Sequence, residues 1–162
     1  MIERPDRVKS GAPKGQTPVL QYSFNWKQLS GVAGISFWNF YFRSHAGAIR
    51  GPQFVEFLQA LAKQIRGKLL VIWDGLPAHR SRVVKDYVEA LDGHIVLERL
   101  PAYAPDLNPV EYIWGYMKQR ELANLCAHTI GEVGSFARNR LKSMQRRPKL
   151  IAAFWKQAEL PI

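Results

Sequence analysis

The stretch LLVIWDGLPAHRS, residues Leu69 to Ser81, decides the fold prediction. Four apolar residues followed by Trp73 are typical of a buried strand, and this strand ends in a carboxylate, Asp74. A Gly/Pro turn comes next, with His79 close behind it. A buried strand that ends in a charge leaves two alternatives. Asp74 is either a turn residue or one ligand of a metal site.

The segments on both sides of this strand predict a mixed sheet. Residues 51–67 carry apolar side chains at the i, i+4, i+7, i+11 spacing of an amphipathic helix. A helix over residues 81–91 and a strand over residues 94–100 follow Asp74. Strand–helix–strand units have right-handed crossovers, so their two strands run parallel. The earlier residues are rich in β-branched and aromatic types and predict two or three antiparallel strands, Pro18 to Trp26, Gln28 to Ser36 and Phe37 to Arg43.

The chain divides into three predicted regions. Residues 1–16 are an irregular polar lead-in, residues 17–128 form an α/β core of a mixed sheet flanked by helices, and residues 129–162 form a basic helical region. In the core, a Pro-rich turn leads from the later strand into a helix over residues 110–125. Residues 130–144 predict the last helix, and a short apolar tail follows it. Open α/β sheets bind ligands at the carboxyl ends of their strands, which is where Asp74 lies.

Composition narrows the class of protein. Of 162 residues, 47% are hydrophobic and 22% charged, which predicts a globular domain with a core rather than a disordered chain. No apolar run has the length of a membrane span or the type of a signal peptide, so we expect a cytoplasmic protein. Cys126 is the single cysteine, which excludes a disulfide or a zinc knuckle within the chain.

The net charge of +10 predicts a polyanionic partner, either nucleic acid or an anionic membrane. The charge is densest in residues 138–149, a run without any acid. We predict that its basic residues contact nucleic-acid phosphates, the alternative being a solvated helix face. These residues are Arg138, Arg140, Lys142, Arg146, Arg147 and Lys149.

Two carboxylates are the predicted site. Asp74 ends a strand, Glu111 opens a helix, and the intervening helix and strand allow both to reach one edge of the sheet. Converging carboxylates select Mg²⁺ or Mn²⁺, and a pair of such ions is the usual device for phosphodiester chemistry. Singly, Glu111 could equally serve the helix dipole. His79 could bind a phosphate, tune a metal-bound water, or simply open the helix at Ser81.

These residues carry a resemblance to a known family. LLVIWDGLPAHRS together with LERLPAYAPDLNPVEYIWGYMKQRELANL resembles the catalytic core of DDE transposases, and more narrowly the bacterial insertion-sequence 630 branch of the Tc/mariner superfamily. The most specific part is LPAYAPDLNPVEYIW, residues Leu100 to Trp114. The segment APKGQTPVL, Ala12 to Leu20, is also similar to the family. The resemblance runs from about Ala12 to about Leu125, which is most of the chain.

The resemblance implies a ribonuclease H-like fold and a triad of two aspartates and a glutamate that holds two Mg²⁺ ions. It implies an enzyme that cuts DNA at transposon ends and joins the freed 3′-hydroxyl to a target. By position, Asp74 matches the second aspartate and Glu111 the glutamate. His79 matches the family's histidine after that aspartate, and Asn108 with Pro109 matches the turn that places the glutamate.

One feature departs from the family. The family's first aspartate lies on a first strand upstream of the G-x-TP segment, whereas the residues upstream of that segment in this chain are polar. Asp6 lies there between Pro5 and Arg7, a context that does not suit a central strand. We therefore expect a core that lacks its first strand, its first aspartate and the helix-turn-helix half. The exposed sheet edges that would result predict pairing with another chain, as in a homodimer, or else aggregation or marginal stability.

Two functions follow from these observations. The first is the catalytic, metal-dependent portion of a DNA transposase, with weak or no activity in the isolated chain because the first aspartate is missing. The alternative is a transposase remnant that binds DNA by its basic surface alone, with steep salt dependence and no need for metal. A different nuclease on the same fold is a third option, which the LNPVEYIW segment disfavours.

Overall fold

The computed structural model of the chain describes residues 29–101, 105–123, 125–127 and 129–160. Its first elements form an antiparallel hairpin of β1 (Leu29–Ile35) and β2 (Phe40–Ala46), in which Ile35 pairs with Phe40 and Leu29 with Ala46. The strand predicted at residues 28–36 is confirmed. The next strand begins later than predicted, because Ser36 and Asn39 close the turn between them. The strand predicted at Pro18 to Trp26 and the lead-in lie outside the described residues.

The parallel pair of strands forms as predicted. Strand β3 (Leu69–Trp73) pairs in parallel with β4 (Ile95–Arg99), and α2 (Arg82–Glu89) makes the crossover. Leu69 pairs with Ile95 and Trp73 with Arg99. Among the described residues the strands form two separate two-stranded sheets, the β1–β2 hairpin and the β3–β4 pair, rather than one continuous mixed sheet.

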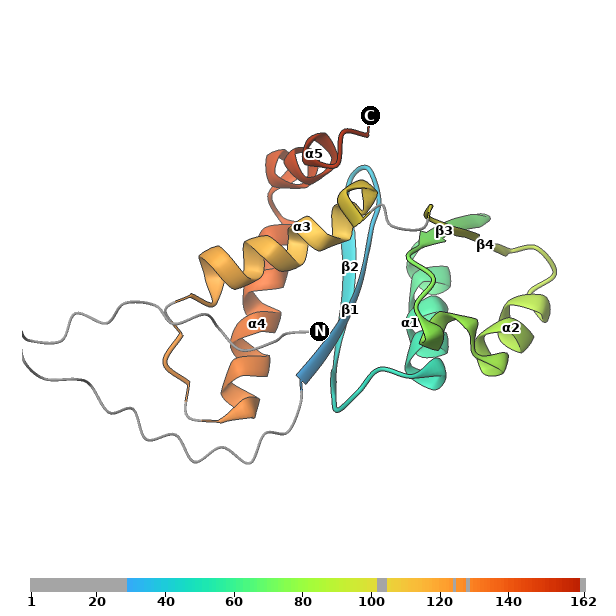
Figure 1. Cartoon of the computed structure of the whole chain (residues 1–162), viewed down its shortest axis with the longest axis horizontal. Helices are drawn as coiled ribbons and strands as arrows, with labels where there is room; N and C mark the ends of the chain where they lie inside the picture. Colours follow the sequence, from blue (N-terminus) through green and yellow to red (C-terminus); the bar gives the residue numbers. More distant parts are fainter. Residues whose placement is uncertain (1–28, 102–104, 124, 128, 161–162) are drawn as a thin grey trace, which may run out of the picture.

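Helix α1 (Gly51–Gln64) joins the two sheets through one hydrophobic core (Figure 1). Its amphipathic spacing is the predicted one, although the helix ends before Gly67. The apolar face of α1 packs against Val32 of the hairpin, the inner face of β3 and β4, and Val84 of α2. The buried members of this core are Val32, Phe54, Phe57, Leu58, Leu61, Leu69, Val84 and Ile95.

The opposite face of the hairpin is covered by the C-terminal helices. They are α3 (Pro109–Tyr116), a π-helical turn η3 (Met117–Glu121), α4 (Ile130–Gln145) and α5 (Pro148–Gln157). The predicted helix over residues 110–125 is therefore shorter and changes its winding, and a helix occupies the predicted apolar tail. A second core lies under these helices and contains Phe40, Ile113, Met117, Ala137, Leu141, Met144, Ile151 and Phe154.

The architecture is thus a hairpin between two helical layers, with a parallel strand pair beside it (Figure 1). The predicted α/β class is confirmed. The outer face of the β3–β4 pair leaves Leu70, Ile72 and Val96 exposed. In the described part of the chain, no helix combines the length and apolarity that crossing a membrane requires.

The close approach of α3 to the hairpin depends on a glycine. A Cβ atom at Gly31 would lie 2.8 Å from Cη2 of Trp114, whereas one at Gly34 would lie 3.5 Å from Cζ of Phe57, an ordinary contact. Neither glycine has a positive φ, so alanine suits both backbones.

We expect Gly31→Ala to lower the free energy of unfolding by about 1–3 kcal/mol, because the rigid indole must shift. Gly34→Ala is the matched control and should be neutral or stabilising by up to about 1 kcal/mol. Urea denaturation of the two variants measures the difference. Equal stabilities would show that Trp114 does not pack against β1 as described.

Candidate active site

Asp74 lies at the carboxyl end of β3, as predicted. Its Oδ1 accepts a hydrogen bond of 3.2 Å from the backbone N–H of Leu76, so the carboxylate does close a turn. Gly75 continues the chain with a φ of 73°, a backbone conformation that favours glycine. The Asp74 side chain nevertheless keeps 38% of its surface exposed. The turn role therefore does not prevent the carboxylate from meeting a solvent-borne ligand.

His79 is buried against Asp74. Its Nδ1 lies 3.1 Å from Asp74 Oδ1, and only 6% of the side chain is exposed. The two atoms are within hydrogen-bonding distance, although the N–H direction in the structure departs from that of an ideal hydrogen bond. The ring stacks on Trp73, with centroids 4.5 Å apart and planes 10° from parallel, and meets Phe54 edge-on at 3.9 Å. This cage fixes the imidazole behind the carboxylate. Sequence reasoning missed both aromatic partners.

The surroundings of Asp74 hold it in the ionised form. The contact with His79 lowers the pKa of Asp74 below its ordinary value, and burial opposes this by disfavouring the charge. The N–H of Leu76 adds to the lowering. The Asp74 carboxylate is therefore charged at neutral pH, as a cation ligand must be.

Glu111 lies in the first turn of α3, and Asn108 sets where that helix begins. Asn108 Oδ1 accepts a 3.2 Å hydrogen bond from the N–H of Val110, and its backbone oxygen accepts one of 3.0 Å from Glu111. Pro109 occupies the first helical position, where its missing N–H has no cost. This cap places Glu111 at the third helical position with an exposed side chain.

Asp74 and Glu111 lie at the two ends of one connection. The N–H of Leu100, just past β4, donates a 2.8 Å hydrogen bond to the carbonyl of Trp73, so the chain leaves β4 beside Asp74. It then reaches Asn108 and the start of α3. Among the described residues, no group of three or more His, Cys, Asp and Glu side chains gathers as a metal site would require. The pairing of the two carboxylates on metal stays a prediction.

Comparison with known protein families assigns the chain to one of them. A family model described as DDE superfamily endonuclease matches residues 2–132. The chain belongs to the DDE superfamily endonucleases. A search of curated protein sequences found no match.

Solved structures share the fold of this DDE superfamily endonuclease. The Mos1 strand transfer complex is 21% identical with a TM-score of 0.67, over 96% of this chain and 48% of that one. The Mos1 mariner paired end complex with Mn is 20% identical with a TM-score of 0.67, over 96% and 49%. The catalytic domain of Mos1 mariner transposase is 18% identical with a TM-score of 0.63, over 86% and 73%.

These likenesses confirm the predicted ribonuclease H-like fold. The chain spans about half the length of the Mos1 chains in the strand transfer complex and the paired end complex.

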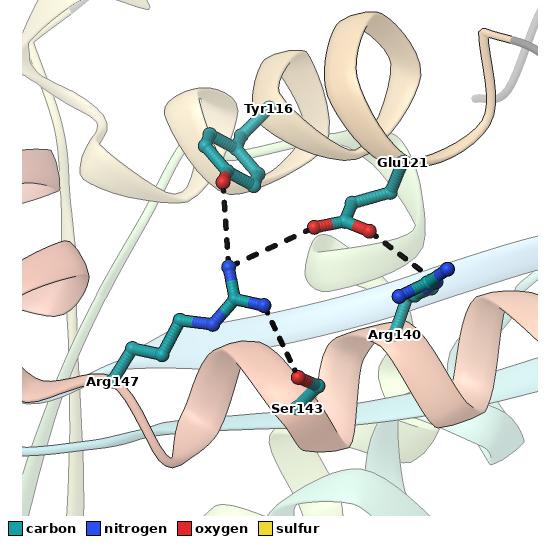
Figure 2. Close-up of polar contacts among 5 residues, drawn as sticks. All are labelled: Tyr116, Glu121, Arg140, Ser143 and Arg147. Carbon is teal, nitrogen blue, oxygen red and sulfur yellow. Dashed lines mark hydrogen bonds and ion pairs between the residues drawn. The ribbon is translucent and has the colours of Figure 1, made fainter.

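Two of the six basic residues predicted to contact DNA are engaged within the protein (Figure 2). The Glu121 carboxylate lies between the guanidinium groups of Arg140, at 3.3 Å, and Arg147, at 3.9 Å. Arg147 also donates hydrogen bonds to Tyr116 and Ser143. Only 11% of the Glu121 side chain is exposed, so these contacts hold η3 onto α4. Sequence reasoning missed Glu121 because the acid lies outside the basic run.

The other four basic residues of the run are exposed and form no ion pair within the described part of the chain. They are Arg138, Lys142, Arg146 and Lys149. Helical periodicity separates the two groups on α4. Arg138 and Lys142 are four residues apart on one flank, whereas Arg140, Ser143 and Arg147 follow the other flank. The first flank is thus available to an external anion.

We expect His79→Phe to raise the pKa of Asp74, because phenylalanine keeps the ring packing and removes the polar contact. Carboxyl ¹³C NMR titration in chelator-containing buffer measures this. The wild type should lose its stability advantage over the variant as pH falls through the lowered Asp74 pKa and keep it above about pH 4. Arg80→Ala, in the same turn, is the control. An unchanged Asp74 pKa in His79→Phe would contradict the statement that contact with His79 lowers this pKa.

Proposed function

We propose that this DDE superfamily endonuclease chain is the catalytic portion of a DNA transposase, with Asp74 and Glu111 as ligands of Mg²⁺ or Mn²⁺. The observation that carries the proposal is the ionised, half-exposed carboxylate of Asp74 at a strand end, backed by a buried histidine. Exposed oxygen donors of this kind suit hard divalent cations. The structural relatives include Mos1 transposase catalytic domains with Mn and with Mg.

Each residue has a separate task in this proposal. Asp74 and Glu111 supply charged oxygens from two different elements, a strand end and a helix start. His79 orients Asp74 from behind and is shielded from the substrate by its own burial. Asn108 fixes the helix register that presents Glu111. Bound divalent cations would polarise the scissile phosphodiester and activate a water or a 3′-hydroxyl.

Metal binding tests the assignment without requiring activity. We expect Asp74→Asn and Glu111→Gln each to weaken Mn²⁺ binding about tenfold or more in isothermal titration calorimetry, because each removes a charged ligand. Asp86→Asn is the matched control, since Asp86 is an exposed acid on α2 paired with Arg82.

Two outcomes would change the proposal. Unchanged Mn²⁺ affinity in both variants, with DNA binding that ignores metal, would leave the alternative of a DNA-binding module without catalysis. Metal-dependent nicking of supercoiled DNA by the wild type, abolished by Asp74→Asn, would show that the chain is active by itself. That result would contradict the expectation of a weak or inactive enzyme.

Variants in the basic run distinguish residues that contact DNA from residues that form ion pairs within the protein. We expect Arg138→Ala and Lys142→Ala each to reduce the slope of log affinity against log salt by about 1, because each removes one phosphate contact. Arg140→Ala should leave the slope nearly unchanged and lower stability instead, since Arg140 pairs with Glu121. Filter binding on duplex DNA at several salt concentrations measures the slopes. Equal reductions in all three variants would show that the pairing with Glu121 yields to DNA.

A further inference from the structure

The turn between β1 and β2 presents two aromatic rings to solvent. Phe37 is 54% exposed and Trp38 is 85% exposed, at the two central positions of the turn. Gly, Pro, Asn and Asp are the usual residues there, because they suit turn geometry. Large rings are not needed for the turn itself, and the exposure of Trp38 in particular forgoes the stabilisation that burial gives. The exposed rings are therefore candidate contacts for a ligand.

The turn is rigid despite its exposure. Ser36 N–H and Ser36 Oγ both donate to the carbonyl of Asn39, at 2.7 and 2.9 Å. Asn39 N–H donates back to Ser36 Oγ at 3.2 Å, and Asn39 Oδ1 accepts from Phe40 N–H at 2.9 Å. A turn locked at both ends fixes the backbone of its central residues, so this backbone need not be ordered on binding.

Helix α5 supports one of the two rings and leaves the other free. Trp155 of α5 donates from Nε1 to the carbonyl of Ser36 at 3.0 Å, and its ring lies 5.1 Å from that of Phe37. Within the described residues no ring packs on Trp38 in the same way. The turn thus offers one buttressed ring and one free indole face.

The helix that supports the turn carries two exposed lysines. Lys149 and Lys156 are seven residues apart on α5, so they share one exposed face and lie about 10 Å apart along the helix axis. Lys156 directly follows Trp155. Neither lysine has an ion pair among the described residues, and the chain carries a net charge of +10. A free ring on the turn and cations on the helix that supports the turn match a ligand that combines flat rings with phosphates.

The turn also lies near the proposed catalytic helix. Ile35 and Phe40, on either side of the turn, pack in the same core as Ile113, two residues after Glu111. Figure 1 shows the tip of the hairpin beside the first turn of α3.

We propose that Trp38 stacks on an unpaired base of single-stranded or frayed DNA, with Lys149 and Lys156 on its phosphates. Paired bases are already stacked, so a free indole gains most from an unpaired one. The inference rests on the proposed function, because cutting and joining DNA produces such ends.

Equilibrium binding in EDTA tests this inference apart from the metal site. We expect Trp38→Ala to bind a labelled single strand about tenfold more weakly than wild type, and the duplex of the same sequence within about twofold. Trp38→Phe should restore most of the affinity. Ile72→Ala, which removes another exposed apolar side chain, is the matched control and should bind like wild type. Because Trp38 is exposed, thermal unfolding should show all three variants folded.

A stacking probe gives the second measurement. A 2-aminopurine base in the single strand should be quenched by wild type and Trp38→Phe and not by Trp38→Ala. Lys149→Ala and Lys156→Ala should each lower the salt slope on the single strand.

Three results would overturn the inference: no loss of affinity in Trp38→Ala, an equal loss on duplex, or reduced self-association in place of reduced DNA binding. The inference fails separately from the proposed function, because neither measurement depends on Asp74, Glu111 or metal.

Discussion

The two-stranded hairpin is the constraint on which the other elements depend, because both of its faces are buried at once. One face receives α1 through Val32 and the other receives α3 to α5 through Phe40. Side chains alternate along a strand, so each strand must supply both cores in turn. The small residue at Gly31 lets the indole of Trp114 approach the backbone. A change of register by one residue would exchange the two cores.

The two candidate ligands, Asp74 and Glu111, lie at the ends of regular elements rather than on long loops. Asp74 follows a strand whose inner face is packed on α1, and Glu111 follows a capped helix start. Such positions hold a carboxylate with little freedom, which would suit the proposed cation site. The buried imidazole of His79 adds a fixed neighbour to Asp74, so the orientation of this carboxylate depends on the same core that stabilises the fold.

Local sequence signals were enough for part of this structure. The strand at Leu69–Trp73 and its parallel partner follow from apolar runs between turn residues. The turn at Asn108 and Pro109 was expected only from the family resemblance, and the structure shows Asn108 as the helix cap. Contacts between distant segments were beyond such signals. Nothing near His79 predicts that Phe54, on α1, packs on its ring. Likewise, the basic run gives no sign that Glu121 neutralises two of its members.

The π-helical turn η3 allows the helical segment of α3 and η3 to contact both the hairpin and α4. A π turn contains one more residue than an α turn, and each residue advances an α-helix by about 100°. The side chains after Met117 are therefore out of phase with those of α3. Ile113 faces the hairpin core, whereas Glu121 meets Arg140 of α4 and Arg147, which precedes α5. If the same residues were wound as an α-helix, Glu121 would be turned by about 100° from the direction in which it meets its partners. The extra residue thus sets the angle between the side of this helix that packs on the hairpin and the side that contacts α4.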